Sequence, residues 1–135
     1  MKEQRIYYRK YDWAIRAFYD VDCRDKYSVI SALMDIGCKD ANLRDSIRSV
    51  ESCHLNEGLT FANYMTREMV VMITKTTSPA QFTNSFVHET HHMAEFIAGE
   101  AGVPYVGEAI SYVAGDIAML MHPVAGKWLC PRCSH

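Results

Sequence analysis

Three histidines and two glutamates lie within positions 88 to 95 of a chain that has six histidines in all. His88, Glu89 and His92 fit the pattern H-E-x-x-H. Residues four apart lie one turn apart on the same face of a helix, so both imidazoles can turn a ring nitrogen toward one metal ion. Glu89 lies about 100° further round the helix than His88, within reach of a water molecule on that ion. The spacing predicts a zinc site with Glu89 as general base and acid.

A third ligand is needed, because a catalytic zinc ion ordinarily has three protein ligands and one open position. Ala98 stands where the extended form of the pattern would have a third histidine, so that arrangement is excluded. Glu108 opens the next expected helix, and an antiparallel return of the chain would bring it over His92. We therefore predict that Glu108 is the third ligand. His91 is predicted to be a surface or neighbouring group rather than a ligand.

Two further polar residues follow Glu108 on its helix. Tyr112 shares the face of Glu108 and can donate a hydrogen bond to an oxyanion or to Glu108, which makes it a candidate catalytic residue. A partly buried core aromatic is the alternative interpretation of Tyr112. Asp116 can orient a ligand histidine from behind, with a solvated helix position as the alternative.

Helices and a sheet must position these residues, and hydrophobic periodicity indicates where they lie. Alternating bulky and polar residues predict one or two strands up to Asp22, and apolar residues at helical spacing follow. Ser78 and Pro79 are typical of a helix start, so the H-E-x-x-H helix is expected from there to about Ala98. The other expected elements are helices over 25–37 and 40–53, a β-hairpin within 58–76 and a last helix that ends near His122 and Pro123.

The length of 135 residues fits one domain with a sizeable core. We predict an α+β domain with a small, mainly antiparallel sheet and helices packed on it. Its parts are the N-terminal strands and two helices (1–57), the hairpin (58–76), the metal-site helices (78–122) and a cysteine-containing tail (123–135).

Composition excludes some classes of partner. The net charge is −2 and no run of like charges is long enough to indicate a nucleic-acid partner. No stretch approaches the length of a membrane span, and no signal peptide is evident, so a soluble cytoplasmic protein is expected. Five cysteines without a secretory signal predict reduced thiols rather than disulfides. The sequence does not indicate an oligomeric state.

The C-terminal tail offers soft ligands of its own. Cys130 and Cys133 have the spacing of a zinc knuckle, and His135 follows them. A second, structural zinc site is one interpretation, and a reduced, exposed tail is the other.

The sequence HETHH, followed by GEAISYVAGD, resembles the zincin metallopeptidases, and specifically their gluzincin branch, over residues 68 to 121. The resemblance implies a zinc ion held by His88, His92 and Glu108, with Glu89 as general base. It also implies a strand near residues 69–74 with which an extended substrate could pair. The whole chain is similar to small uncharacterised bacterial proteins of the kind carried on mobile elements, which look like metallopeptidases.

These observations lead us to expect zinc-dependent hydrolysis of a peptide bond in a peptide or protein substrate. Two alternatives stay open at this stage. One is a non-catalytic zinc-binding interaction module with a vestigial site, and the other is a zinc hydrolase of a non-peptide amide.

Overall fold

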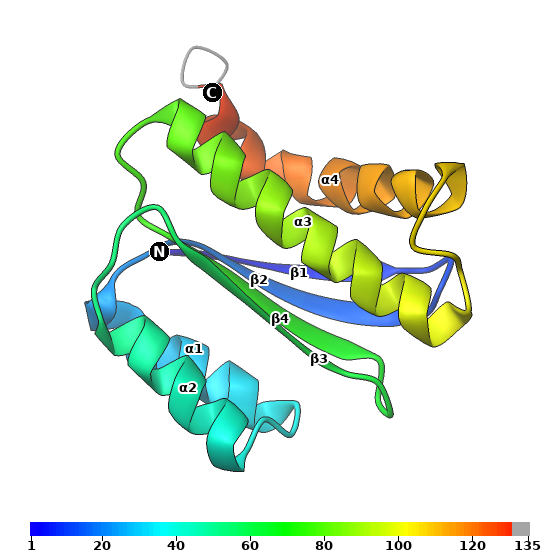
Figure 1. The fold of residues 1–135 in the computed structure, drawn as a ribbon. Coiled ribbons are helices and arrows are strands. Elements are labelled where there is room, and N and C mark those ends of the chain that lie inside the picture. Colours follow the sequence, from blue (N-terminus) through cyan, green and yellow to red (C-terminus); the bar gives the residue numbers. More distant parts are fainter. Residues whose placement is uncertain (131–135) are drawn as a thin grey trace.

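A four-stranded mixed sheet is the centre of the computed structural model, which describes residues 1–130 (Figure 1). Its strands are β1 (Lys2–Tyr8), β2 (Trp13–Val21), β3 (Gly58–Asn63) and β4 (Glu68–Thr74). The order across the sheet is β1-β2-β4-β3. Two antiparallel hairpins, β1–β2 and β3–β4, meet through the parallel pair β2–β4. The predicted α+β class with a small, mainly antiparallel sheet is confirmed.

Helices cover both faces of this sheet (Figure 1). One face carries α3 (Pro79–Ala101) and α4 (Glu108–Leu129). The other face carries α1 (Lys26–Asp35) and α2 (Asp40–Glu51), preceded by the short 3₁₀ helix η1 (Cys23–Asp25). Within residues 1–130, none of the helices has the length and apolar character that crossing a bilayer would require.

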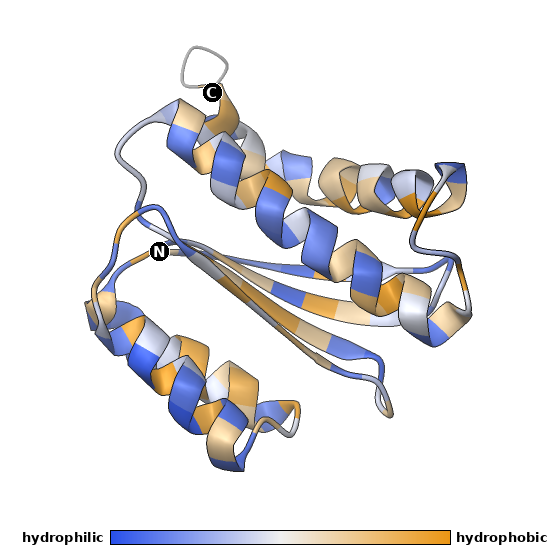
Figure 2. Ribbon diagram, in the orientation of Figure 1, coloured by the Kyte–Doolittle hydropathy of each residue, from blue (hydrophilic) through white to orange (hydrophobic). Residues whose placement is uncertain are grey.

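Side-chain alternation along the strands creates two hydrophobic cores. In β2, Trp13, Ile15, Ala17 and Tyr19 belong to the core under α3 and α4, as the sequence predicts. Phe18 belongs to the core under α1 and α2. Val21 joins that second core because the strand is irregular between Phe18 and Val21, which interrupts the alternation. Figure 2 shows hydrophilic patches on the outward side of α3, so this helix buries one side and leaves the other in contact with solvent.

The edge strand β3 has one face of small residues. Gly58, Thr60 and Ala62 alternate with Leu59 and Phe61, which pack into the core under α1 and α2. The small residues lie on the side that faces α3, where Ala62 joins the core and Thr60 bonds to the helix. Because short side chains leave little bulk between strand and helix, α3 can approach β3 closely.

Local signals fix both ends of α3. Ser78 is extended, and its hydroxyl accepts a hydrogen bond from the backbone N–H of Gln81 at 3.1 Å. Pro79 occupies the first turn, where its missing N–H costs nothing. Gly102, with φ of +73°, ends the helix in the left-handed conformation. The helix is one turn longer than the periodicity indicates.

The last helix continues past its predicted end at Pro123 and runs to Leu129. Proline removes one backbone N–H from the helix, and packing beyond it compensates. Trp128 stacks on Tyr19 of β2 and on Phe82 of α3, with ring centroids 5.4 and 5.6 Å apart. These contacts tie the end of α4 to the sheet and to α3.

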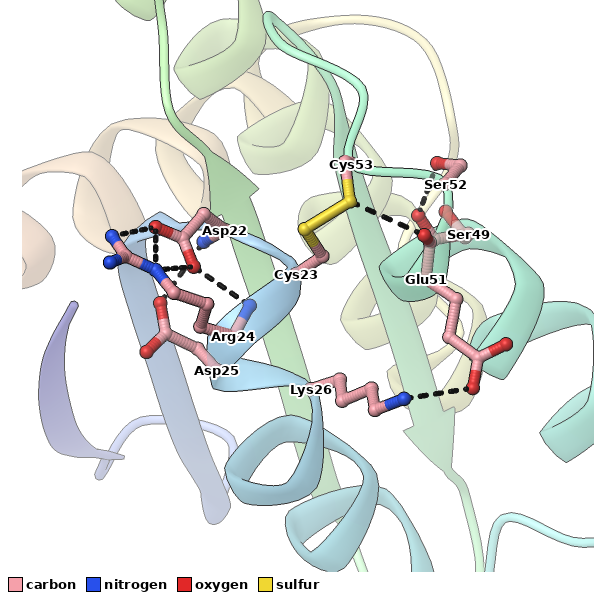
Figure 3. The surroundings of a disulfide bond; sticks show 9 residues. All are labelled: Asp22, Cys23, Arg24, Asp25, Lys26, Ser49, Glu51, Ser52 and Cys53. Atoms are coloured by element: carbon pink, nitrogen blue, oxygen red, sulfur yellow. Dashed lines mark hydrogen bonds and ion pairs between the residues drawn. A yellow bond between two sulfur atoms is a disulfide. The ribbon is translucent and has the colours of Figure 1, made fainter.

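A disulfide joins Cys23 to Cys53, with the two Cα atoms 4.9 Å apart (Figure 3). The prediction of reduced thiols is therefore wrong for this pair. The reason lies in tertiary structure, because α1 and α2 run antiparallel and bring Cys53, two residues after α2, beside the start of η1. Cys38 keeps a free thiol, and burial raises its pKa.

Removing this disulfide should destabilise the fold. The bridge closes a loop with a sequence separation of 30 residues, so replacing both cysteines with serine should lower the free energy of unfolding by about 2–4 kcal/mol. Urea unfolding of the wild type and of the double variant Cys23→Ser/Cys53→Ser would measure the change. Equal midpoints for the two proteins would contradict the prediction.

Candidate functional site

The two histidines of the H-E-x-x-H pattern converge on the exposed side of α3. The Nε2 atoms of His88 and His92 lie 3.0 Å apart, and their rings meet nearly edge to face with centroids 4.6 Å apart. The side chain of His92 is 45% exposed, so solvent reaches this pair. The predicted pairing of the two imidazoles on one helix face is therefore observed.

The separation of these nitrogens suits two ligands of one ion. Two nitrogens bound to a tetrahedral zinc ion at the usual bond length lie about 3.3 Å apart. The observed 3.0 Å is close to that value, and both atoms can carry a lone pair in neutral imidazole. A hydrogen bond between the two neutral rings fits the same distance. The pair thus meets the geometric requirement for two of the ligands of a metal ion.

Glu89 lies beside the pair but on the buried side of the helix. Glu89 is only 3% exposed, and its Oε2 atom accepts a hydrogen bond from the Thr60 hydroxyl of β3 at 2.6 Å. A cavity of about 250 Å³ opens next to it, and Glu89 and His88 line this cavity together with Gly58 and Asn84. A carboxylate and an imidazole therefore share one cavity at the junction of α3 and β3.

His91 and Glu95 form a separate surface pair. His91 Nε2 lies 3.0 Å from a carboxylate oxygen of Glu95, and both side chains are exposed. Glu95 also lies 3.8 Å from Nδ1 of His92. His91 is thus a surface group, as predicted, and its ring does not join the Nε2 atoms of His88 and His92.

The predicted three-ligand set is not assembled. Among residues 1–130, no group of three or more histidine, cysteine or acidic residues is placed to hold a metal ion. His88, His92 and Glu108 therefore do not form the gluzincin site that the resemblance implies. Over residues 1–130, the arrangement of these side chains is therefore not that of a zincin.

The position of α4 explains why Glu108 is not part of the site. Gly115 and Ala118 of α4 line a cavity with Thr90 and His91, so α4 packs along that side of α3. His88 and Glu89 line their cavity with Gly58, on the side of α3 that faces β3. Glu108 also lies seven residues before Gly115, which is about 10 Å along the helix axis. Both the side of the helix and the distance along it separate Glu108 from the histidine pair.

The two other site residues that the sequence predicts on α4 are Tyr112 and Asp116. Tyr112 lies on α4, and its side chain is exposed. Asp116 accepts a hydrogen bond from the Tyr8 hydroxyl of β1 at 2.6 Å, and burial together with this bond raises the pKa of Tyr8. Asp116 therefore orients a tyrosine at the edge of the sheet. Within residues 1–130, neither residue is hydrogen-bonded to His88 or His92.

The resemblance implies that a substrate would pair with a strand near residues 69–74, which is β4. The structure makes β4 unsuitable for this pairing. β4 lies between β2 and β3 and hydrogen-bonds to both, so its backbone has no free edge. The edge strand next to Glu89 is β3, which among residues 1–130 pairs only with β4. Of the two strands of this hairpin, β3 is therefore the one with which an incoming extended chain could pair.

The predicted second zinc site lies mostly outside the described residues. Cys133 and His135 belong to residues 131–135, for which no placement is described. Cys130 ends the described chain and is disulfide-bonded, so its sulfur does not titrate. A disulfide sulfur is not a thiolate ligand for zinc.

Sequence reasoning missed the two β3 residues that contact Glu89. Thr60 donates to its carboxylate, and Gly58 lies so close that an added Cβ would stand 2.6 Å from Glu89 Cγ. The alternation of small and large residues in GLTFAN was the available signal, because it marks one face of the strand as a place of close approach.

Comparisons with family models, with curated proteins and with solved structures find no match for this chain. The function must therefore be argued from the site itself.

Proposed function

We propose that the protein is a zinc-dependent hydrolase of peptide bonds, with His88 and His92 as two of the ligands of the ion and Glu89 as the general base. The observation that carries this proposal is the convergence of the two Nε2 atoms at 3.0 Å beside the oriented carboxylate of Glu89. The two imidazoles are exposed enough for an ion and a substrate to reach them, and the carboxylate has a fixed position behind them.

A zinc ion held by the two imidazoles would lower the pKa of a water molecule and polarise the carbonyl oxygen of the scissile bond. Glu89 takes a proton from the attacking water molecule as the water oxygen adds to the carbonyl carbon. When the C–N bond breaks, Glu89 returns this proton to the leaving amine. The Thr60 hydroxyl remains bonded to Oε2 of Glu89, so the other oxygen, Oε1, is the one available for the proton.

The free edge of β3 supports a peptide as the substrate. A strand at the edge of a sheet presents backbone N–H and C=O groups with which an extended peptide can pair. β3 is such an edge, and its residues Gly58 and Thr60 lie next to the carboxylate of Glu89. A peptide paired with β3 would therefore pass close to the proposed reaction centre.

Metal analysis of the purified protein tests the first step of this proposal. We expect about one zinc ion per chain in the wild type and its loss in His88→Ala, because one imidazole alone leaves a weak site. His91→Ala is the matched control on the same helix and should keep the metal. Glu108→Ala should keep it too, since Glu108 does not approach the pair.

Cleavage of a peptide library by the zinc-loaded protein tests the second step. Hydrolysis that disappears in His88→Ala and persists in His91→Ala would support the proposal. Zinc binding without cleavage would instead support a non-catalytic zinc-binding module. Cleavage of non-peptide amides alone would show that the substrate is a non-peptide amide and not a peptide. A wild-type protein that binds no zinc would overturn the proposal.

A further inference from the structure

Thr60 and Glu89 meet across two elements that are far apart in the sequence. The residues are separated by 29 positions, and the hydroxyl-to-carboxylate distance is 2.6 Å. This distance lies in the range of charge-assisted O–H···O⁻ bonds, which are about twice as strong as neutral ones. The contact therefore links the edge strand directly to the acid of the H-E-x-x-H pattern.

Burial makes this contact consequential. Glu89 is 3% exposed, and a carboxylate removed from water is costly unless a donor satisfies it. A glutamate side chain also has several rotatable bonds, so a buried carboxylate without a fixed donor could adopt more than one orientation. One bond to Oε2 limits rotation of the carboxylate and thereby sets the direction of Oε1.

Gly58 determines the space into which Oε1 is directed. A Cβ at position 58 would lie 2.6 Å from Cγ and 2.8 Å from Oε1 of Glu89, distances at which the carboxylate would have to move. Gly58 and Thr60 are two positions apart on β3 and so face the same side of the strand. The strand thus offers a donor at one position and an open space at the other.

We propose that Thr60 is a positioning residue for Glu89, and that Gly58 supplies the space in which Thr60 holds the carboxylate beside His88. The importance of Thr60 for catalysis rests on the proposed hydrolase function, whereas the effect of Thr60 on the geometry of Glu89 does not. The small-residue face of β3 thus orients the carboxylate of Glu89 in addition to allowing α3 to pack closely.

Two substitutions at Thr60 separate its hydroxyl from its bulk. Thr60→Val keeps the shape and removes the donor, whereas Thr60→Ser keeps the donor and removes a methyl group. With the zinc-loaded protein and a cleaved peptide, we expect Thr60→Val to lower kcat by about 10-fold to 100-fold, with KM little changed. Thr60→Ser should recover most of that loss. An equal loss in both variants, or no loss in Thr60→Val, would overturn the positioning role.

An infrared measurement on the zinc-free protein gives a readout that does not depend on activity. The carboxylate stretch of Glu89 is identified as the band that disappears in Glu89→Gln. We expect this band to shift in Thr60→Val and in Gly58→Ala, and to stay in place in Thr60→Ser and in the control Leu59→Ala, whose side chain faces the other core. An unshifted band in Thr60→Val would overturn the proposal even if the protein hydrolyses peptides. A shift in a protein that proves inactive would support the positioning and refute only the hydrolase function.

Discussion

Replacing Glu89 with glutamine is expected to lower kcat by about 100-fold to 10,000-fold while the zinc content stays at the wild-type level. Glutamine has the shape of glutamate and can still accept the Thr60 hydrogen bond, so the fold should be retained. It cannot take a proton from water, however, and the proton transfer to the leaving amine is lost with it. Steady-state kinetics on a cleaved peptide, with metal analysis of the same sample, would measure both quantities.

Glu108→Gln is the matched control for this experiment. Glu108 is an exposed acid at the start of α4, on the helix that packs along the other side of α3. Its replacement should leave kcat within about twofold of the wild type, as surface substitutions outside a site ordinarily do. Undiminished hydrolysis by Glu89→Gln would refute the role of Glu89, and a loss in Glu108→Gln would show that this acid reaches the site.

Replacing Phe82 with alanine should cause the largest loss of stability that we predict, about 3–5 kcal/mol in the free energy of unfolding. Phe82 is 1% exposed, and its ring stacks on those of Phe86 and Trp128 at centroid distances of 6.0 and 5.6 Å. Its removal leaves a cavity where α3, α4 and the sheet meet. Equilibrium urea unfolding followed by circular dichroism would measure the loss.

Val87→Ala provides the comparison on the same helix. Val87 is 59% exposed, so its truncation creates no internal cavity and should change the free energy of unfolding by no more than about 0.5 kcal/mol. Similar losses in Phe82→Ala and Val87→Ala would mean that the stacked rings do not form the core between α3, α4 and the sheet.

Local patterns in the sequence predict much of the fold because they reflect local physics. The alternation of Trp13, Ile15, Ala17 and Tyr19 identifies the buried face of β2, and Ser78 with Pro79 identifies the start of α3. The convergence of His88 and His92 is likewise a property of one helix, so the spacing alone predicts it.

Contacts between distant elements could not be predicted in the same way. Periodicity shows which face of α4 is apolar, but it does not show along which side of α3 that helix will pack, and the prediction for Glu108 failed there. The Cys23–Cys53 bridge depends on the antiparallel return of two helices, which composition does not reveal. Thr60 was overlooked because a threonine in an edge strand is unremarkable until the helix above it is placed.

The Cys23–Cys53 bridge also bears on how the chain finds its fold. The pairing of β2 with β4 is parallel, so a long connection that contains α1, α2 and β3 must close before it forms. Closing a longer loop costs more chain entropy, and folding slows as contacts become more distant in sequence. A bridge across 30 residues of that connection shortens the effective path between the two hairpins. An oxidised chain should therefore search fewer arrangements before its hairpins come into register.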